Sequence, residues 1–219
     1  MKFFLDTAFI EQVEEAKSWG ILDGVTTNPT HVAHTGLPAR EVYRQILAAV
    51  DVPVSLECIA LDAEGIVREA RKLAALADNV VVKVPIICEG LKAVKQLAAE
   101  GIKTNVTLNF SAMQALLAAK CGATYISPFV GRLDLIGHCG MDLVREIKTI
   151  YGHYGFKTQI ISAALRHPRH VLESALAGAE VATMPLEIMR QLYYHPMTDA
   201  GLTQFLADWK TVPEPAGAN

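Results

Sequence analysis

The sequence has 219 residues, of which 51% are hydrophobic and 20% are charged. This length suits one or two domains, and the hydrophobic share provides a sizeable core. The formal net charge of −3 and the isoelectric point near 6.2 give no support for nucleic acid or an anionic membrane surface as a partner.

Short runs rich in β-branched residues alternate along the chain with longer segments of helical periodicity. The first run lies in "MKFFLDTAFIEQ", which does not resemble a secretory signal because Asp6 and Glu11 interrupt it. The runs predict strands at residues 2–6, 23–28, 53–58, 80–84, 102–107, 124–129, 158–164 and 180–184. This alternation is typical of βα units around a parallel sheet.

Four segments between or after these strands have clear helical patterns. Residues 62–77 have apolar side chains at helical spacing, with Asp62 at the N-cap position. Residues 111–122 begin with a capping serine and end with a glycine, and residues 141–155 are also predicted to be helical. Residues 199–210, "DAGLTQFLADWK", predict an extra helix at the end of the chain, and no apolar run of 18 residues predicts a transmembrane span.

Eight βα units indicate the α/β class and a single closed (β/α)8 TIM barrel. The alternative is an open, doubly wound sheet, but no GxGxxG motif follows the first strand. We expect one domain over residues 1–210, with the barrel and the extra helix, and a disordered tail at 211–219 that is rich in proline and small residues.

The cysteines show no CxxC pairing and no spacing of metal ligands. We therefore expect a cytoplasmic protein with reduced thiols that lie mostly in the core. The four residues concerned are Cys58, Cys88, Cys121 and Cys139.

One lysine interrupts a strongly apolar strand, "NVVVKVP", at position 83. Lysine is seldom buried without a partner. Burial among valines, and a cation such as Arg132 nearby, would favour the neutral amine, which attacks ketones and forms a Schiff base. The alternative is a structural ion pair between Lys83 and either Asp6 or Glu57.

Polar side chains gather where the predicted strands end, and in a TIM barrel these ends carry the active site. A lone Asn or Thr there is often structural, but seven strands direct such groups to the same rim. The two carboxylates could transfer protons, the two asparagines could hold hydroxyl groups, and the two arginines suit an anionic end group such as a phosphate. The rim set comprises Asp6, Thr26, Thr27, Asn28, Glu57, Lys83, Asn105, Thr107, Ser127, Phe129, Arg132 and Arg166.

Six motifs together resemble the small transaldolases, in the same family as fructose-6-phosphate aldolase. They are "FFLDTA", "GVTTNPT", "VVVKVP", "GIKTNVTL", "ISPFVGRLDLIG" and "RHPRHV", and the resemblance extends from about residue 1 to 210. It implies a (β/α)8 barrel that needs neither a metal nor an organic cofactor. It also implies an enzyme of carbohydrate metabolism, in the pentose phosphate pathway.

The resemblance assigns roles to individual residues. Lys83 matches the Schiff-base lysine and Asp6 the general acid/base of bond cleavage. Glu57 matches the carboxylate that activates the catalytic water, and Thr107 the threonine beside that water. Asn28 and Asn105 match the groups that hold the dihydroxyacetone unit, and the arginines match the phosphate-binding positions. The substrate-binding set comprises Thr26, Asn28, Asn105, Ser127, Phe129, Arg132 and Arg166.

Two positions distinguish the transaldolases of this family from its aldolases, and at three positions this chain differs from the usual family residue. Glu57 and Phe129 resemble the transaldolase side rather than the aldolases. At the departures the family has asparagine, threonine and serine, respectively, where this chain has Phe9, Ile87 and Ala164. The serine would lie beside the phosphate, so its replacement leaves the donor and acceptor sugars open.

We therefore expect a transaldolase that acts on a ketose phosphate such as fructose 6-phosphate or sedoheptulose 7-phosphate. The alternatives are an aldolase that releases free dihydroxyacetone, a transaldolase for a sulfonated ketose, and an inactive barrel that binds sugar phosphates. The resemblance also implies a homo-oligomer, a pentamer or decamer, in which the helix at 199–210, with Phe205 and Trp209 on one face, reaches a neighbour. A helix packed on its own subunit is the alternative.

Overall fold

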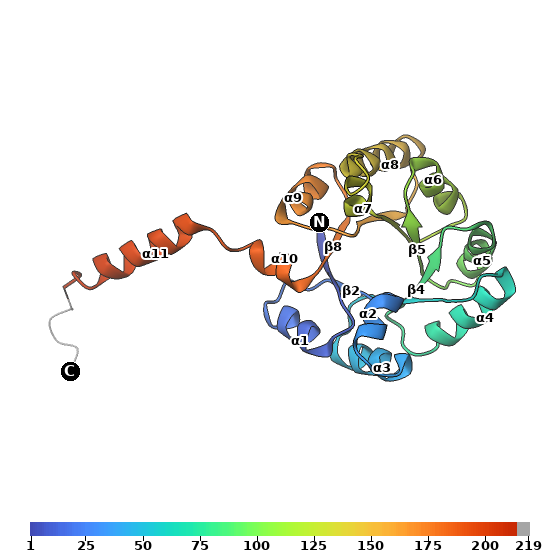
Figure 1. Cartoon of the computed structure of the whole chain (residues 1–219), viewed down its shortest axis with the longest axis horizontal. Coiled ribbons are helices and arrows are strands. Elements are labelled where there is room, and N and C mark those ends of the chain that lie inside the picture. Colours follow the sequence, from blue (N-terminus) through green and yellow to red (C-terminus); the bar gives the residue numbers. More distant parts are fainter. Residues whose placement is uncertain (214–219) are drawn as a thin grey trace.

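The computed structural model describes residues 1–213, which contain a closed barrel of eight parallel strands (Figure 1). Each strand pairs with its neighbours in the sequence, and β8 closes the barrel against β1. The predicted (β/α)8 fold is confirmed. The strands are β1 (Lys2–Asp6), β2 (Gly24–Thr26), β3 (Val54–Glu57), β4 (Val80–Pro85), β5 (Thr104–Asn109), β6 (Tyr125–Pro128), β7 (Gln159–Ser162) and β8 (Val181–Met184).

Helices surround the barrel in Figure 1, and two connections, β2–β3 and β6–β7, hold two helices each. The predicted caps are present: Asp62 accepts the Gly65 N–H at 2.8 Å, and Ser111 accepts the Gln114 N–H at 3.2 Å. The helices are α1 (Ile10–Ser18), α2 (Pro29–His34), α3 (Ala39–Ala49), α4 (Ala63–Ala74), α5 (Cys88–Ala99), α6 (Ala112–Lys120), α7 (Val130–Asp134), α8 (Gly140–Tyr154), α9 (Pro168–Leu176), α10 (Leu186–Gln191) and α11 (Pro196–Trp209).

Strand alternation explains how one lysine fits among the valines of β4. Val80, Val82 and Val84 pack in the main core, and the period of two turns Val81 and Lys83 to the opposite side, inside the barrel. Val81 belongs to a buried cluster in the barrel interior, together with Phe4, Tyr125, Ile161 and Val181. Each member of this cluster is followed two residues later by a residue of the next layer. These residues are Asp6, Lys83, Ser127, Ala163 and Thr183. An apolar layer therefore closes the barrel beneath a mainly polar layer.

Left-handed backbone lies at two of the strand ends that differ from the prediction, those of β5 and β7. Leu108 has a φ of 60°, and the register between β5 and β6 shifts between Val106 and Asn109. β5 therefore runs two residues beyond its predicted end, through a bulge. Ala164 has a φ of 56°, so β7 ends before its predicted limit and Ala163 makes only an isolated bridge to Phe129.

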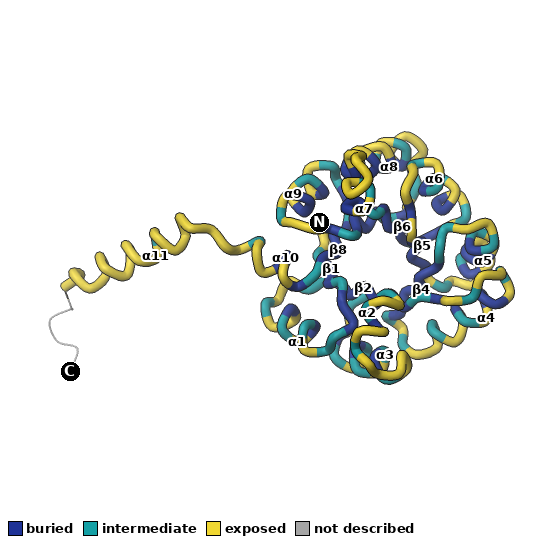
Figure 2. The backbone as a smooth tube through the Cα atoms, viewed as in Figure 1, coloured by how far each residue is buried: buried dark blue, intermediate teal, exposed yellow. Residues whose placement is uncertain are grey.

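The last helix leaves the barrel (Figures 1 and 2), and none of its residues is buried. It therefore does not pack on its own barrel, which was the alternative to a contact with a neighbour. None of the helices in residues 1–213 is long and apolar enough to cross a membrane. The predicted disordered tail begins at 211, and residues 214–219 lie outside the described part of the chain.

The prediction that the cysteines are mostly core residues is wrong. All four are free thiols, but only Cys58 is buried, and burial raises the pKa of its thiol to about 12. Cys121 is half-buried, whereas Cys88 and Cys139 are exposed. These two exposed residues stand at the first position of α5 and at the N-cap of α8.

Candidate active site

A cavity of about 370 Å³ opens at the carboxyl ends of the strands. All of the rim residues predicted from the sequence line it except Thr27 and Asn105. Asn105 lies directly below, where its side-chain oxygen accepts the Ser127 hydroxyl at 2.7 Å and its amide donates to the Ser55 hydroxyl at 3.2 Å. The structure thus brings the predicted residues to one place.

Lys83 lies in the cavity wall with only 5% of its surface exposed. Its Nζ donates to the carbonyl oxygen of Thr27 at 2.9 Å and lies 3.1 Å from Oε2 of Glu57. Of the two ion pairs weighed from the sequence, the one with Glu57 is therefore present. A carboxylate at this distance compensates the buried charge and can also take a proton from the amine.

Asp6 faces the cavity with both carboxylate oxygens engaged. Thr26 donates its hydroxyl to Oδ1 at 2.9 Å, and Nε2 of His31 lies 3.3 Å from Oδ2. Burial raises the pKa of the Asp6 carboxyl, but the His31 hydrogen bond and the positive charge of Lys83 outweigh this effect and leave the pKa below its usual value. The carboxylate is therefore held in its charged form, ready to accept a proton.

His31 is a cavity residue that the sequence reasoning missed. It occupies the first turn of α2, where the Asn28 side chain accepts the His31 N–H at 2.9 Å and Pro29 begins the helix. The "NPTH" order is the signal that could have revealed it, because a capped helix beginning at the strand end turns its third residue back over that end. Thr183, whose hydroxyl lies 2.6 Å from that of Thr26, was also missed.

Thr107 contributes a buried hydroxyl to the cavity lining. Its register partner on β4 is Pro85, two residues after Lys83, and it lines the cavity. Within residues 1–213 its Oγ1 has no hydrogen-bond partner. A buried hydroxyl without a partner is costly, so this atom is suited to hold a water or a substrate hydroxyl in the cavity.

The two predicted arginines also line the cavity. The Arg132 guanidinium lies 5.2 Å from the centre of the Phe129 ring, and both Arg132 and Arg166 are exposed. Gly131 lets their segments touch, because a β-carbon there would lie 2.3 Å from the carbonyl oxygen of Ala164 and 2.8 Å from Cγ of Arg166. Two guanidinium groups in one cavity suit an anionic group, which each could bind with two hydrogen bonds.

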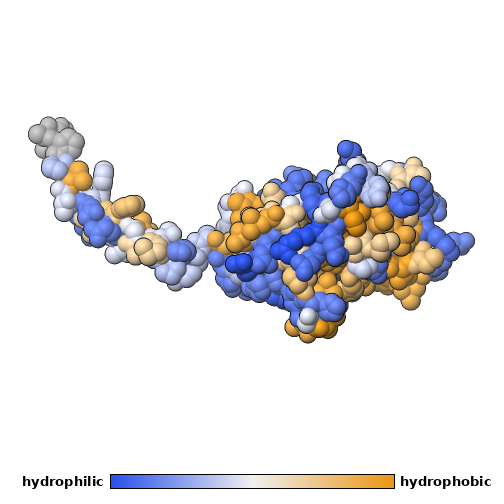
Figure 3. Space-filling view, turned by 90° about the horizontal axis from the view of Figure 1, so that it is seen from above, coloured by the Kyte–Doolittle hydropathy of each residue, from blue (hydrophilic) through white to orange (hydrophobic). Residues whose placement is uncertain are grey.

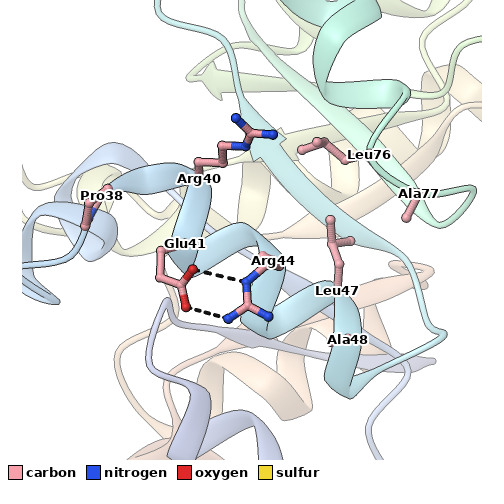
Figure 4. Close-up of a pocket in the computed structure, with 8 residues that line it drawn as sticks. All are labelled: Pro38, Arg40, Glu41, Arg44, Leu47, Ala48, Leu76 and Ala77. Atoms are coloured by element: carbon pink, nitrogen blue, oxygen red, sulfur yellow. Dashed lines mark hydrogen bonds and ion pairs between the residues drawn. The ribbon is translucent and has the colours of Figure 1, made fainter.

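A second cavity, of about 590 Å³, lies on the outer wall of the barrel beside α3 (Figure 4). Its one acid, Glu41, accepts the Arg44 guanidinium at 2.7 Å, so these two charges satisfy each other. None of the predicted site residues lines it. Its lining residues are Pro38, Arg40, Glu41, Arg44, Leu47, Ala48, Leu76 and Ala77.

Comparison with known proteins identifies the family. The sequence model of the transaldolase/fructose-6-phosphate aldolase family matches residues 3–214. The chain belongs to this family. Its members include enzymes named for aldolase and transaldolase chemistry, so the prediction of an enzyme of this kind is confirmed.

Curated relatives of this transaldolase/fructose-6-phosphate aldolase family member carry the name probable transaldolase. One from Aquifex aeolicus (strain VF5) is 63% identical over 98% of this chain and 99% of its own length. One from Coprothermobacter proteolyticus is 60% identical over 97% and 98% of the two chains. A third, from Methanococcus maripaludis (strain C5), is 57% identical over 96% and 98%.

Two of the three departures from the family fall at helix N-caps. Phe9 caps α1 and Ile87 caps α5, and neither makes a side-chain hydrogen bond to its helix. The asparagine and threonine expected from the family are residues that supply such bonds. These two departures therefore concern the stability of helix ends, whereas Ala164 lies in the cavity wall.

Proposed function

We propose that the protein is a transaldolase that transfers a dihydroxyacetone unit from a ketose phosphate to an aldose phosphate through a Schiff base on Lys83. The proposed donors are fructose 6-phosphate and sedoheptulose 7-phosphate. The observation that carries the proposal is the buried amine of Lys83 in the cavity, 3.1 Å from the Glu57 carboxylate. Such an arrangement suits nucleophilic attack followed by proton transfer.

The first steps make the Schiff base. Glu57 takes a proton from Lys83, and the neutral amine attacks the C2 carbonyl carbon of the ketose. The carbonyl oxygen takes a proton from the attacking nitrogen and becomes the hydroxyl of a carbinolamine. Glu57 returns the proton to this hydroxyl through a water held at Thr107, and the hydroxyl leaves as water while the C2–N bond becomes an iminium.

Cleavage then needs a second base. Asp6 accepts the proton of the C4 hydroxyl, the C3–C4 bond breaks, and its electron pair flows into the iminium. An aldose leaves, and an enamine remains on Lys83. An acceptor aldose reverses these steps: the enamine attacks its aldehyde, Asp6 returns the proton, and water releases the product. Asn28 and Asn105 hold the hydroxyl groups of the three-carbon unit.

The anionic end of each sugar binds between Arg132 and Arg166, with Thr26, Ser127 and Phe129 completing the wall. Phe129 keeps the enamine side apolar, so the enamine waits for an aldehyde rather than receiving a proton. Among enzymes the alternative is an aldolase that releases free dihydroxyacetone. Ala164 keeps a second alternative open, in which the end group is a sulfonate.

The proposal includes a homo-oligomer in the cytoplasm, a pentamer or decamer. Its support is α11, which extends from the barrel and displays apolar side chains (Figure 3) that are largely exposed within this chain. Unpaired apolar surface of this kind marks interaction sites. The exposed residues are Met197, Leu202, Phe205, Leu206 and Trp209.

Borohydride reduction in the presence of fructose 6-phosphate tests the proposal. We expect a three-carbon adduct on Lys83 by mass spectrometry, and neither adduct nor turnover in Lys83→Ala with an unchanged circular dichroism spectrum. No adduct in the wild type would support the inactive binding barrel instead. Free dihydroxyacetone from the donor alone, without an acceptor, would support the aldolase.

A further inference from the structure

A buried histidine links the two segments that carry the arginines of the cavity. The imidazole of His170, on α9, accepts the backbone N–H of Arg166 at Nδ1, at 3.2 Å. Its Nε2 donates to Oδ2 of Asp134 at 2.9 Å. Asp134 ends α7, the helix of Arg132, and its other oxygen accepts the Gly140 N–H at 2.8 Å. The His170 side chain therefore bonds to both segments that carry the arginines of the proposed anion site.

The charge state of His170 fits this pair of bonds. Burial and the neighbouring His167 lower the pKa of His170, and they outweigh the opposing effects of Asp134 and Glu173. The ring is therefore neutral near pH 7 and has one donor and one acceptor nitrogen. Because Asp134 takes the Nε2–H, Nδ1 is left as the acceptor for Arg166.

We propose that His170 is a positioning residue of the anion site: it holds the backbone of Arg166 at a fixed distance from the helix of Arg132, with Asp134 setting its tautomer. The inference rests on the proposed function, because it assumes that the two arginines bind the anionic end of the substrate. Neither His170 nor Asp134 lines the cavity, so neither touches the substrate.

The proposal explains how two exposed guanidinium groups act as one site. Long arginine side chains at a surface lose conformational freedom when they converge on an anion, and this loss weakens binding unless their backbones are fixed. Gly131 brings the two backbones into contact, and the His170 hydrogen bonds prevent the Arg166 loop from moving away. A substrate without an anionic group would not depend on this support.

Two variants of His170 separate its two bonds. In His170→Asn the side-chain oxygen takes the position of Nδ1 and can still accept the Arg166 N–H, but the amide cannot reach Asp134. In His170→Gln the amide reaches Asp134, but no acceptor faces Arg166. Asp134→Asn can donate to Nε2, which would place the ring hydrogen on Nδ1 against the Arg166 N–H. His153→Asn, at an exposed position in the last turn of α8, is the matched control.

Kinetics with fructose 6-phosphate, together with borohydride trapping of dihydroxyacetone on Lys83, tests the inference. We expect the KM for fructose 6-phosphate to rise about 10-fold in His170→Gln and Asp134→Asn, the value for one lost hydrogen bond, with a smaller rise in His170→Asn. Inhibition by inorganic phosphate should weaken in parallel. Trapping of neutral dihydroxyacetone should remain at the wild-type rate in every variant.

The outcomes distinguish this inference from the proposed function. If the wild type traps no dihydroxyacetone, the proposed function fails, whatever His170 does. If the wild type traps it but His170→Gln keeps the wild-type KM for fructose 6-phosphate, the inference is overturned. Equal losses for dihydroxyacetone and fructose 6-phosphate would also overturn it, because they would indicate a general structural role.

Discussion

Gly131 and Ala164 approach so closely that a β-carbon on Gly131 would lie 2.3 Å from the carbonyl oxygen of Ala164. No side chain fits there without displacing backbone. The contact joins the segment of Arg132 to the segment of Arg166. The geometry of the proposed anion site therefore depends on a position that has no side chain.

Gly131→Ala should consequently weaken the binding of phosphorylated substrates and destabilise the fold. The clash is with backbone, so α7 or the Arg166 loop must move, and overpacking of this kind typically lowers the free energy of unfolding by about 1–3 kcal/mol. Gly152→Ala is the matched control, since within residues 1–213 nothing beyond its chain neighbours and its own helix backbone lies within 4 Å of the added β-carbon. It should raise helix stability by up to about 1 kcal/mol. Urea denaturation and the KM for fructose 6-phosphate measure both variants, and a Gly131→Ala enzyme with wild-type values would contradict the assigned contact.

Asp6→Asn and Glu57→Gln should separate the two proton transfers. Asp6→Asn should still form a Schiff base but cleave poorly, because the base for the C4 hydroxyl is gone. Glu57→Gln should slow formation of the adduct itself, since the carboxylate 3.1 Å from Lys83 is lost. Losses of roughly 10²- to 10⁴-fold are expected for each. Borohydride trapping and turnover are measured side by side, and equal effects of both variants on both quantities would refute the assignment.

His31→Leu should move the acid limb of the activity profile to higher pH. The His31 hydrogen bond helps keep the pKa of Asp6 below its usual value, and cleavage needs the carboxylate, so activity falls as pH drops through that pKa. Without the bond the pKa rises, and the acid limb should move to higher pH. Asp6 stabilises the fold above its unfolded pKa of about 3.9, and this stabilisation is lost as pH falls through the lowered folded value.

The control for this shift is His34→Leu, an exposed histidine on the same helix. It should leave the profile of kcat/KM against pH unchanged. If both leucine variants shift the acid limb equally, the effect belongs to the stability of α2 rather than to the contact between His31 and Asp6.

Helix caps offer a test of the other family departures. Phe9→Asn and Ile87→Thr place a hydrogen-bonding side chain at N-caps that have none, and both residues already have the extended backbone that a cap needs. Each change should raise the free energy of unfolding by about 0.5–2 kcal/mol. Phe9→Leu and Ile87→Val add no acceptor and should bring no such gain. Thermal and urea unfolding measure the four variants, and equal stability within each pair would exclude missing caps as the consequence of these departures.

The sequence predicts the fold and the cavity lining because both depend on local order. Alternation in "VVVKVP" places Lys83 above Val81 inside the barrel, and parallel strands carry their end residues to one rim. His31 and His170 escaped prediction because their partners, Asp6 and Asp134, come from other units and meet them only after the helices pack. The prediction that the cysteines lie mostly in the core was wrong for a related reason. Cysteine as a residue type favours burial, but Cys88 and Cys139 stand where helices begin at the surface.

The left-handed backbone at Ala164 was not predicted from the sequence either. It means that a substitution of Ala164 needs a control for backbone strain. With a φ of 56°, Ala164 holds a conformation that L-residues seldom adopt, next to the Arg166 segment. A serine carries the same β-carbon, so Ala164→Ser adds only a hydroxyl. Ala164→Gly is the matched control, because it relieves the backbone strain and adds no donor.

Ala164→Ser should therefore strengthen the binding of a phosphorylated donor if the natural substrate is a phosphate. A hydrogen bond to a charged group is worth about 1.5–3 kcal/mol, which corresponds to roughly 10- to 150-fold in affinity. Ser162 does not compensate, because its hydroxyl is buried and accepts the Ser174 hydroxyl at 2.8 Å. KM values of wild type, Ala164→Ser and Ala164→Gly for fructose 6-phosphate and its 6-sulfonate analogue decide the matter. A wild type that prefers the sulfonate, with serine eroding that preference and glycine leaving it intact, would replace the phosphate donor with a sulfonated one.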